Sequence, residues 1–190
     1  VSDGWQQFKS VDNPGSGSAR LESAAGNGRY QYWSSALDQL SSEPIKGTGS
    51  GTFEFWWARN GDIPGFVRDT HSLYFQTAGE LGAIGLLLLV GFLGLTFFGG
   101  AYRAIHASTR RRGQIAAALG GCVAFCVAAG FDWTWQIAVI PIAFLMLSAV
   151  MLTAGDSESG DALPWAGRGA VAVLGLIALI AIAIPLASTT

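Results

Sequence analysis

The first group that could do chemistry is a histidine just ahead of a long apolar run. His71 stands in the stretch THSLYFQTAGELGAIG, from Thr70 to Gly85. If a helix begins here, Asp69 or Thr70 can cap it, and the positive end of the helix then favours a neutral imidazole. A neutral imidazole is the form that accepts a proton as a general base. The residues alone leave a second interpretation open, in which His71 is an interfacial histidine that hydrogen-bonds a loop carbonyl.

The same helix would carry small residues below the histidine. At about 100° per residue, Ala78, Gly82 and Gly85 fall near the direction of His71, whereas Glu80 falls on the opposite face. Small residues in a membrane let another helix or a lipid chain approach closely. We therefore expect the histidine and the small residues to share one face, and we expect Glu80 to be an interfacial acid rather than the partner of His71.

Four cations lie ahead of the histidine and could bind phosphate. They are Arg29, Lys46, Arg59 and Arg68, and arginine suits phosphate better because its planar fork forms two parallel hydrogen bonds. A glycine-rich stretch at residues 47–51 could add backbone amides, although it lacks the lysine and the strand of a P-loop. By themselves these features are a weak signal, since most exposed arginines face solvent.

Composition identifies the chain as a membrane protein. Of its 190 residues, 51% are hydrophobic and 13% are charged, and the mean hydropathy is +0.40. The net charge of −2 comes without a sustained basic face, so nucleic acid is not an expected partner. Apolar runs of about 18 residues or more predict membrane spans, here over residues 81–102, 114–131, 133–152 and 169–187. We expect an all-α, polytopic integral membrane protein.

Arginines between the first two expected spans orient the chain. Residues 102–113 carry four arginines, at positions 103 and 110–112, and no acid, which makes this loop cytoplasmic by the positive-inside rule. Residues 1–79 then form an extracytoplasmic loop, in which apolar residues at helical spacing predict an amphipathic helix near residues 28–42. Because the chain begins without Met inside a polar stretch, we expect it to be the C-terminal part of a longer protein.

Three further features receive no chemical role. The aromatic residues between positions 53 and 66 suit either the lipid headgroup layer or a small hydrophobic plug on the helix ends. Cys122 and Cys126 are interpreted as small apolar fillers of one span, because two ligands do not make a zinc site. His106 lies in the arginine-rich loop and is interpreted as an incidental polar residue.

The spacing around the histidine resembles the signature of the O-antigen ligase family, which also contains Wzy-type polymerases. In that signature an external histidine is followed by Asn, Ser or Gln, then by nine residues and a Gly-x-x-Gly at the start of a span. Here His71 is followed by Ser72, nine residues, and Gly82 and Gly85.

Two further parts of the family pattern are present. Upstream, an arginine helix leads into a loop of the form P-x-x-G-x-G, here Arg29 with Trp33 and then Pro44, Gly47 and Gly49. Downstream, an aspartate beside an aromatic residue closes a helical hairpin, which is similar to residues 132–133 here. The resemblance covers about residues 29–152. It departs from some ligases at Trp33, where they carry leucine.

The resemblance implies a GT-C-like glycosyltransferase of a bacterial cytoplasmic membrane, with residues 1–79 on the extracytoplasmic face. It would transfer a glycan from an undecaprenyl-pyrophosphate carrier to an acceptor hydroxyl of a glycan or lipid, without a cofactor or metal. His71 would be the general base, whereas Arg29 and Arg68, with Gly47 and Gly49 of the glycine loop, would bind the pyrophosphate or glycan. Ligase and polymerase share this chemistry and are not separated by the sequence.

A non-catalytic polytopic membrane protein is the alternative, either a transporter fragment or a receptor whose external loop binds a glycan or peptide. Transport usually requires ionisable groups in the middle of the spans, and the expected spans carry none there. A membrane anchor with an incidental histidine is the third hypothesis.

Overall fold

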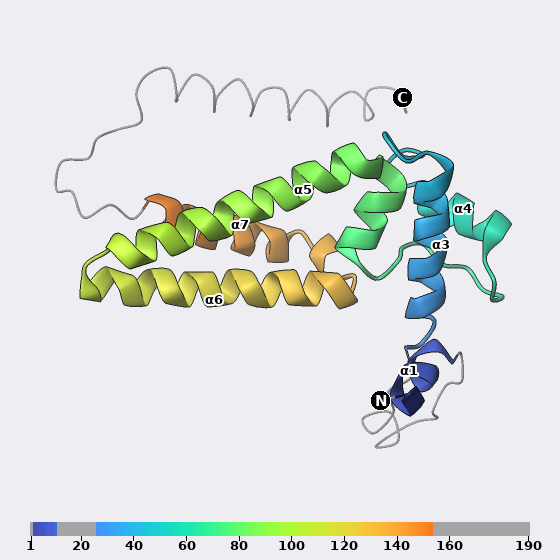
Figure 1. Cartoon of the computed structure of the whole chain (residues 1–190), viewed down its shortest axis with the longest axis horizontal. Helices are drawn as coiled ribbons and strands as arrows, with labels where there is room; N and C mark the ends of the chain where they lie inside the picture. Colours follow the sequence, from blue (N-terminus) through green and yellow to red (C-terminus); the bar gives the residue numbers. More distant parts are fainter. Residues whose placement is uncertain (1, 11–25, 154–190) are drawn as a thin grey trace. The chain divides into compact units, whose positions relative to one another are not determined.

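The computed structural model describes residues 2–10 and 26–153, which form helices and no strand. The elements are α1 (Ser2–Lys9), α3 (Arg29–Ser42), α4 (Phe53–Asn60), α5 (Leu73–His106), α6 (Thr109–Phe131), the 3-10 turn η1 (Thr134–Gln136) and α7 (Val139–Thr153), as shown in Figure 1. The expected all-α class is therefore confirmed for the described residues. The amphipathic helix expected near residues 28–42 corresponds to α3. The fourth expected span, residues 169–187, lies outside the described ranges.

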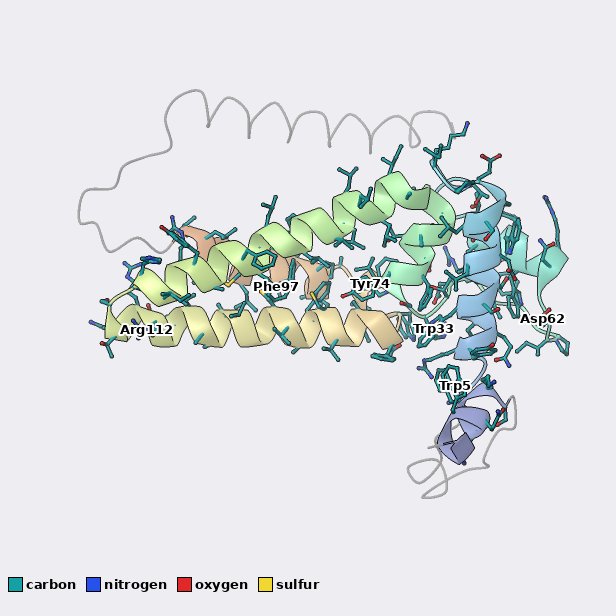
Figure 2. All side chains as sticks on the ribbon, in the orientation of Figure 1. Trp5, Trp33, Asp62, Tyr74, Phe97 and Arg112 are labelled. Carbon is teal, nitrogen blue, oxygen red and sulfur yellow. The ribbon has the colours of Figure 1, made fainter. Side chains whose placement is uncertain are left out.

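Helices α5 and α6 are long and apolar enough to cross a membrane. They have 34 and 23 residues, and their most apolar windows have mean hydropathies of 2.4 and 1.9. Only 17% and 22% of these windows are buried, so most of their apolar side chains face outward, unlike those of a core helix in a soluble protein. Figure 2 shows these side chains along both helices, with Arg112 at one end of the hairpin and Trp33 of α3 beside the other. The arginine-rich turn and α3 therefore lie at opposite ends of α6.

Helix α7 packs on this hairpin and is shorter than the span expected there. It has 15 residues and begins at Val139, whereas the expected span began at residue 133. Pro141 explains the late start, because proline lacks an N–H and clashes with the carbonyl four residues earlier, so a helix tolerates it only in the first turn. The residues ahead of it form η1 instead.

The interior of the three helices is apolar and closely packed. Its buried residues are Leu93, Ile115, Ala118, Cys122, Phe144 and Met151. Cys122 is fully buried and unbridged, and Cys126 packs partly buried against the same cluster. This packing agrees with their interpretation as small fillers.

Helix α5 is interrupted at Gly82, and this break changes the geometry expected around the histidine. Gly82 has φ 62° and ψ −164°, a conformation outside the helical region that a residue without Cβ adopts readily. The first turns of α5 consequently run at an angle to the rest and lie beside α3 (Figure 1). The expected shared face of His71, Ala78, Gly82 and Gly85 is wrong, because His71 precedes the helix and Gly82 breaks it.

The glycine loop at residues 44–49 fills the break in α5. The amides of Ala83 and Ile84 donate to the carbonyls of Pro44 and Ile45 at 2.9 and 3.1 Å, and the amide of Gly49 donates to the carbonyl of Glu80 at 2.8 Å. Backbone groups that the break frees from the helix are thus paired with the loop, as buried amides and carbonyls require. Loop and break form one unit.

Glu80 lies at the centre of this unit and is not the interfacial acid that the helical spacing predicted. Its side chain is buried, with the residue only 6% exposed. Its carboxylate accepts from the amides of Gly51 and Phe53 at 2.9 and 3.2 Å, at the N-terminus of α4, and from Nε2 of Gln76 at 3.2 Å. A carboxylate at this position satisfies amides that α4 cannot pair internally. Glu80 therefore fixes α4 to the start of α5.

The aromatic residues around α4 divide into a buried group and an exposed group. Phe53 and Trp57 are buried with Ala36 of α3 in a second apolar cluster. Phe55 and Phe66 are 58% and 80% exposed. One part of the segment is therefore a hydrophobic plug, and the other part presents aromatic rings outward.

We expect Gly82→Ala to destabilise the fold. A Cβ at residue 82 would lie 2.5 Å from both the amide nitrogen of Gly47 and the carbonyl oxygen of Ile45, and the backbone conformation there disfavours a side chain. Overpacking of this kind costs about 1–3 kcal/mol. The thermal unfolding midpoint of the detergent-purified protein should fall, whereas Gly91→Ala, in the open part of the same helix, should leave it unchanged. Equal midpoints for the two variants would contradict the role given to the break.

Candidate active site

His71 projects from a short turn whose two neighbouring residues are fully buried. Thr70 and Ser72 are both 0% exposed. The hydroxyl of Thr70 donates to the carbonyl of Ser72 at 2.8 Å and accepts from its amide at 3.2 Å. The carbonyl of Thr70 accepts from Nε1 of Trp33 at 3.1 Å, and its amide donates to Oε1 of Gln76 at 3.3 Å. The backbone on both sides of the histidine is therefore fixed by α3 and α5.

The histidine itself has an unusual backbone conformation. Its φ is 56°, in the left-handed region that residues other than glycine adopt infrequently. The amide of His71 donates to Oδ1 of Asp69 at 2.9 Å, which helps to hold this conformation. Backbone conformations of this kind are often found at functional sites.

Asp69 also pairs with the imidazole. Nδ1 of His71 lies 3.0 Å from Oδ1 of Asp69 and 3.2 Å from its carbonyl oxygen. Both oxygens are acceptors, so Nδ1 carries the proton and Nε2 is the nitrogen with a lone pair in the neutral ring. The imidazole side chain is 32% exposed, and that of Asp69 is 15% exposed. The pair is accessible through the imidazole and shielded at the carboxylate.

Pairing shifts the pKa values of His71 and Asp69 in the directions that favour the charged form of each residue. The side-chain hydrogen bond to Asp69 raises the pKa of His71 above 6.5, against an opposing effect of burial. Burial acts to raise the pKa of Asp69, but the hydrogen bonds and charge of His71 outweigh it and lower that pKa below 3.8. The prediction that a helix end keeps the imidazole neutral is therefore wrong, because α5 begins only at Leu73 and a carboxylate lies closer. Asp69 and Thr70 do not cap α5, because their side chains hydrogen-bond within the turn formed by residues 69–72.

Arg29 lies beside the same histidine. Its positive charge acts against protonation of His71 and so opposes the rise in the pKa of His71. Nε of Arg29 donates to the carbonyl of Phe131 at 2.8 Å, which joins the first residue of α3 to the last residue of α6. Tyr32, one turn further along α3, packs on the imidazole with ring centroids 5.6 Å apart and meets Trp57 edge-on. Arg29, His71 and Tyr32 thus form one cluster.

The other residues expected at the pyrophosphate lie elsewhere. Arg68 acts on the charge of Asp69 rather than on His71, and it lines a separate polar cavity. The amides of Gly47 and Gly49 donate to the carbonyls of Glu43 and Glu80. These two amides are occupied and do not form a phosphate cradle, so the glycines position the site through the break in α5.

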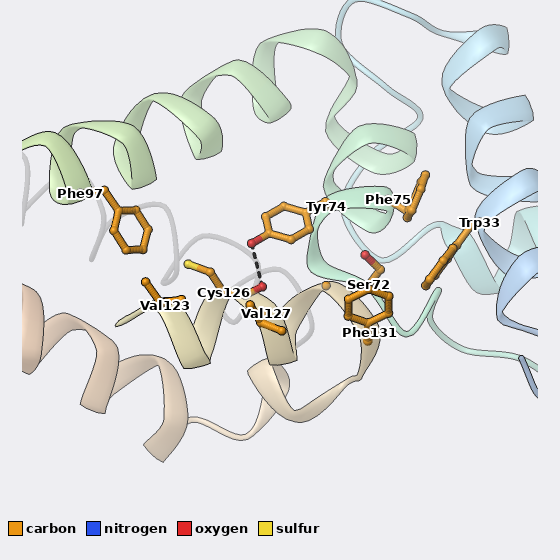
Figure 3. A pocket seen from close by; sticks show the side chains of 10 residues that line it. Trp33, Ser72, Tyr74, Phe75, Phe97, Val123, Cys126, Val127 and Phe131 are labelled. Carbon is orange, nitrogen blue, oxygen red and sulfur yellow. Dashed lines mark hydrogen bonds between the residues drawn. The ribbon is translucent and has the colours of Figure 1, made fainter. Parts of the chain in front are cut away.

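An apolar cavity of about 410 Å³ opens next to the cluster. Its lining comes from α3, the start of α5 and the last turns of α6: Trp33, Ser72, Tyr74, Phe75, Phe97, Val123, Cys126, Val127, Gly130 and Phe131. Figure 3 shows the aromatic rings around this space and the hydrogen bond from the Tyr74 hydroxyl to the carbonyl of Cys126, 2.9 Å long. Phe131 connects the cavity to Arg29, because its carbonyl accepts from that guanidinium.

Fold and site together define a helical protein with two membrane-length helices and a histidine–aspartate pair beside an arginine. The family model of O-antigen ligase matches residues 2–90. This match supports the resemblance to the O-antigen ligase family, a bacterial family of membrane glycosyltransferases of the ligase and polymerase type. The match contains Arg29, the glycine loop and His71, and it ends before Asp132. No curated protein and no solved structure matches the chain.

Two residues that contact His71, namely Asp69 and Tyr32, were not identified as its partners from the sequence. Asp69 was considered only as a helix cap, although an acid two residues before a histidine can reach its ring across a tight turn. Tyr32 was not considered, although it follows Arg29 by three residues and so shares its face of α3. Both signals were present but depended on a turn conformation that the sequence does not specify.

Two substitutions should move the pKa of His71 in opposite directions. Asp69→Asn removes the bond and charge that raise this pKa, so the pKa should fall. Arg29→Gln removes a charge that lowers it, so the pKa should rise. Histidine-selective NMR titration of the purified protein measures both effects, and His106→Gln assigns the second histidine. Asp62→Asn, an exposed acid in the same loop, should change nothing; a shift equal to that of Asp69→Asn would refute the pairing.

Proposed function

We propose that this chain is part of a glycosyltransferase that moves a glycan from an undecaprenyl-pyrophosphate carrier to an acceptor hydroxyl. The observation that carries the proposal is the histidine–aspartate pair near Arg29, adjoining an apolar cavity through Ser72 and Phe131. The family match over residues 2–90 supports the same class of reaction. The acceptor is a glycan or a lipid, for the polymerase or the ligase reaction respectively.

His71 acts as the general base in this proposal. Nε2 takes the proton of the acceptor hydroxyl while that oxygen forms a bond to the anomeric carbon of the donor sugar. The bond from this carbon to the pyrophosphate oxygen breaks, and undecaprenyl pyrophosphate leaves with the electron pair. Asp69 fixes Nδ1–H and stabilises the imidazolium that forms, and the proton then passes to water. A base positioned in this way is worth about 10²–10⁴ in rate.

Arg29 binds the leaving pyrophosphate. Departure of this group concentrates negative charge on its oxygens, and a fixed guanidinium stabilises that charge. The bond to Phe131 uses Nε, so the two terminal nitrogens can form the paired hydrogen bonds that suit phosphate. We place Arg68 at the neighbouring polar cavity instead, and we give Gly47 and Gly49 a positioning role.

The polyprenyl chain of the donor occupies the apolar cavity below Arg29. This cavity replaces the face of small residues that was open to either another helix or a lipid chain. Its lining is almost entirely aromatic and aliphatic, which favours a hydrocarbon chain over a sugar. The hydroxyl of Ser72 is buried in the lining and has no hydrogen-bond partner among the described residues, so it can donate to the first oxygen of the phosphate. The bilayer, the donor lipid and the acceptor are thus the expected partners.

The orientation follows from the two ends of the hairpin. With the arginine-rich turn on the cytoplasmic side, α3, α4 and His71 lie on the extracytoplasmic face of the bacterial cytoplasmic membrane. Residues 1–79 then form the external part, and the carrier is presented to them from the outer leaflet. The turn after α6, with Asp132, shares that side.

We expect His71→Ala to reduce transfer by about 10²–10⁴, and Arg29→Lys to reduce it by about 10²–10³. Lysine keeps the charge at residue 29 but loses the paired geometry of the guanidinium. Transfer of lipid-linked glycan to acceptor is measured with the full-length protein in proteoliposomes at matched expression.

Arg59→Ala is the matched control, because Arg59 is an exposed cation of α4 in the same external part. It should retain normal transfer. Normal transfer by the His71→Ala variant would show that His71 is not the general base. If transfer fell only in the Arg29→Lys variant, His71 would have a structural role only.

Filling the apolar cavity should weaken binding of the lipid-linked donor. Val127→Trp places a large ring in the cavity lining, so the KM for the donor should rise by about tenfold, the effect of losing roughly 1.4 kcal/mol of binding, while kcat changes little. Leu95→Trp adds the same ring to an outward position that is 77% exposed and should leave KM unchanged. The same KM in both variants would argue against a lipid in this cavity.

A further inference from the structure

A second, polar cavity lies on the other side of Asp69. It has a volume of about 250 Å³ and forms where the N-terminus of α4, the start of α5 and η1 meet. Asp69 lines this cavity and at the same time holds His71, through Oδ1 to Nδ1 at 3.0 Å. A ligand in this cavity would therefore contact Asp69, the residue that binds the imidazole of His71.

The lining offers donors and acceptors in a mixed set. Arg68 supplies a guanidinium, Glu54 a carboxylate, and Gln76 and Gln136 amides that both donate and accept. Each hydroxyl of a sugar ring also both donates and accepts. Planar polar side chains of this kind around one small space match a polyol better than a molecule with a single type of polar group.

Trp135 gives the cavity an apolar wall. It belongs to η1 and also lines an adjoining apolar cavity of about 190 Å³ with Leu73 and Phe144. Its indole N–H is buried and makes no hydrogen bond with the described residues, so the cost of removing it from water is not recovered within this part of the chain. A sugar presents both a C–H face that packs on an indole ring and oxygens that accept from an indole N–H.

Three other occupants fit the cavity less well. A phosphate would face the carboxylates of Glu54, Asp69 and Glu80 against one guanidinium. A polyprenyl chain would bury polar groups without pairing them. A metal ion needs closely grouped ligands, and no set of three His, Cys, Asp or Glu side chains within residues 2–10 and 26–153 is arranged to hold one.

We propose that this polar cavity binds one pyranose ring of the glycan substrate, with Trp135 as its stacking surface and with Glu54, Arg68 and Gln136 as hydroxyl partners. The inference rests on the proposed function and adds the residues that select the sugar. Its position next to the histidine–aspartate pair assigns the ring to the acceptor glycan, which must also extend to Nε2 of His71, because His71 itself does not line the cavity. The lipid then lies on one side of the pair and the acceptor sugar on the other.

Saturation-transfer NMR tests the binding of a sugar without requiring transfer. The probes are methyl α-D-glucopyranoside, galactopyranoside and mannopyranoside with the full-length protein in detergent micelles. At least one should show saturation transfer, and its affinity should fall about tenfold in Trp135→Ala. Gln136→Leu, at an exposed position that the fold does not depend on, should weaken it as well and guards against misfolding of the tryptophan variant.

Trp133→Ala is the matched control, since Trp133 lies two residues earlier, is 46% exposed and does not line the cavity. It should bind normally, and because this readout needs no transfer, it separates the inference from the proposed base. Unchanged binding in both Trp135→Ala and Gln136→Leu would overturn the sugar site. Displacement of the probe by inorganic phosphate would also overturn it, because it would identify an anion site.

Transfer kinetics distinguish the two glycan sources. For Gln136→Leu, a higher KM for the acceptor with an unchanged KM for the donor supports the acceptor assignment. A higher KM for the donor alone would overturn that assignment and place the donor glycan in the cavity.

Discussion

The arrangement of the external part depends on how the break in α5 is satisfied. At Gly82 the helix turns away from its own axis, and the unpaired backbone groups around the break bond to residues 44–49. From this point a series of hydrogen bonds leads to the histidine: Glu80 accepts from Gln76, Gln76 accepts from the amide of Thr70, and Thr70 precedes His71. Because each partner is buried, the series is rigid. The position of His71 is thus set by a break one helical segment away.

Two opposing charges control the imidazole. Asp69 stabilises its protonated form, and Arg29 destabilises it. A base next to an arginine alone would be too weak, and one next to a carboxylate alone would release its proton less readily. With both neighbours the proton affinity is moderated, and the aspartate also fixes which nitrogen is free. Binding of an anion to Arg29 would neutralise the opposing charge and raise the pKa of His71 further.

Much of the architecture follows from patterns in the sequence, whereas the site does not. The apolar runs and the spacing around residue 30 predicted helices where α3, α5 and α6 are found. The geometry around His71 was wrong because helical periodicity assigns faces only to a continuous helix, and Gly82 was interpreted as a small side chain rather than as a backbone break. Glu80 was misplaced for the same reason. Asp69 depended on the positive φ of His71, which no side chain in the sequence specifies.

The bond from Arg29 to Phe131 has a consequence for any anion that binds this guanidinium. The carbonyl of Phe131 ends α6, where the peptide dipoles of a helix accumulate negative charge. The guanidinium of Arg29 therefore already contacts a partial negative charge, the carbonyl of Phe131, when no anion is bound. Because this carbonyl occupies Nε, an anion at the two terminal nitrogens shares the guanidinium with a negative partner, so its net gain is smaller than that of a full ion pair. Such sharing weakens the hold on a bound anion and leaves the first turn of α3 joined to the end of α6.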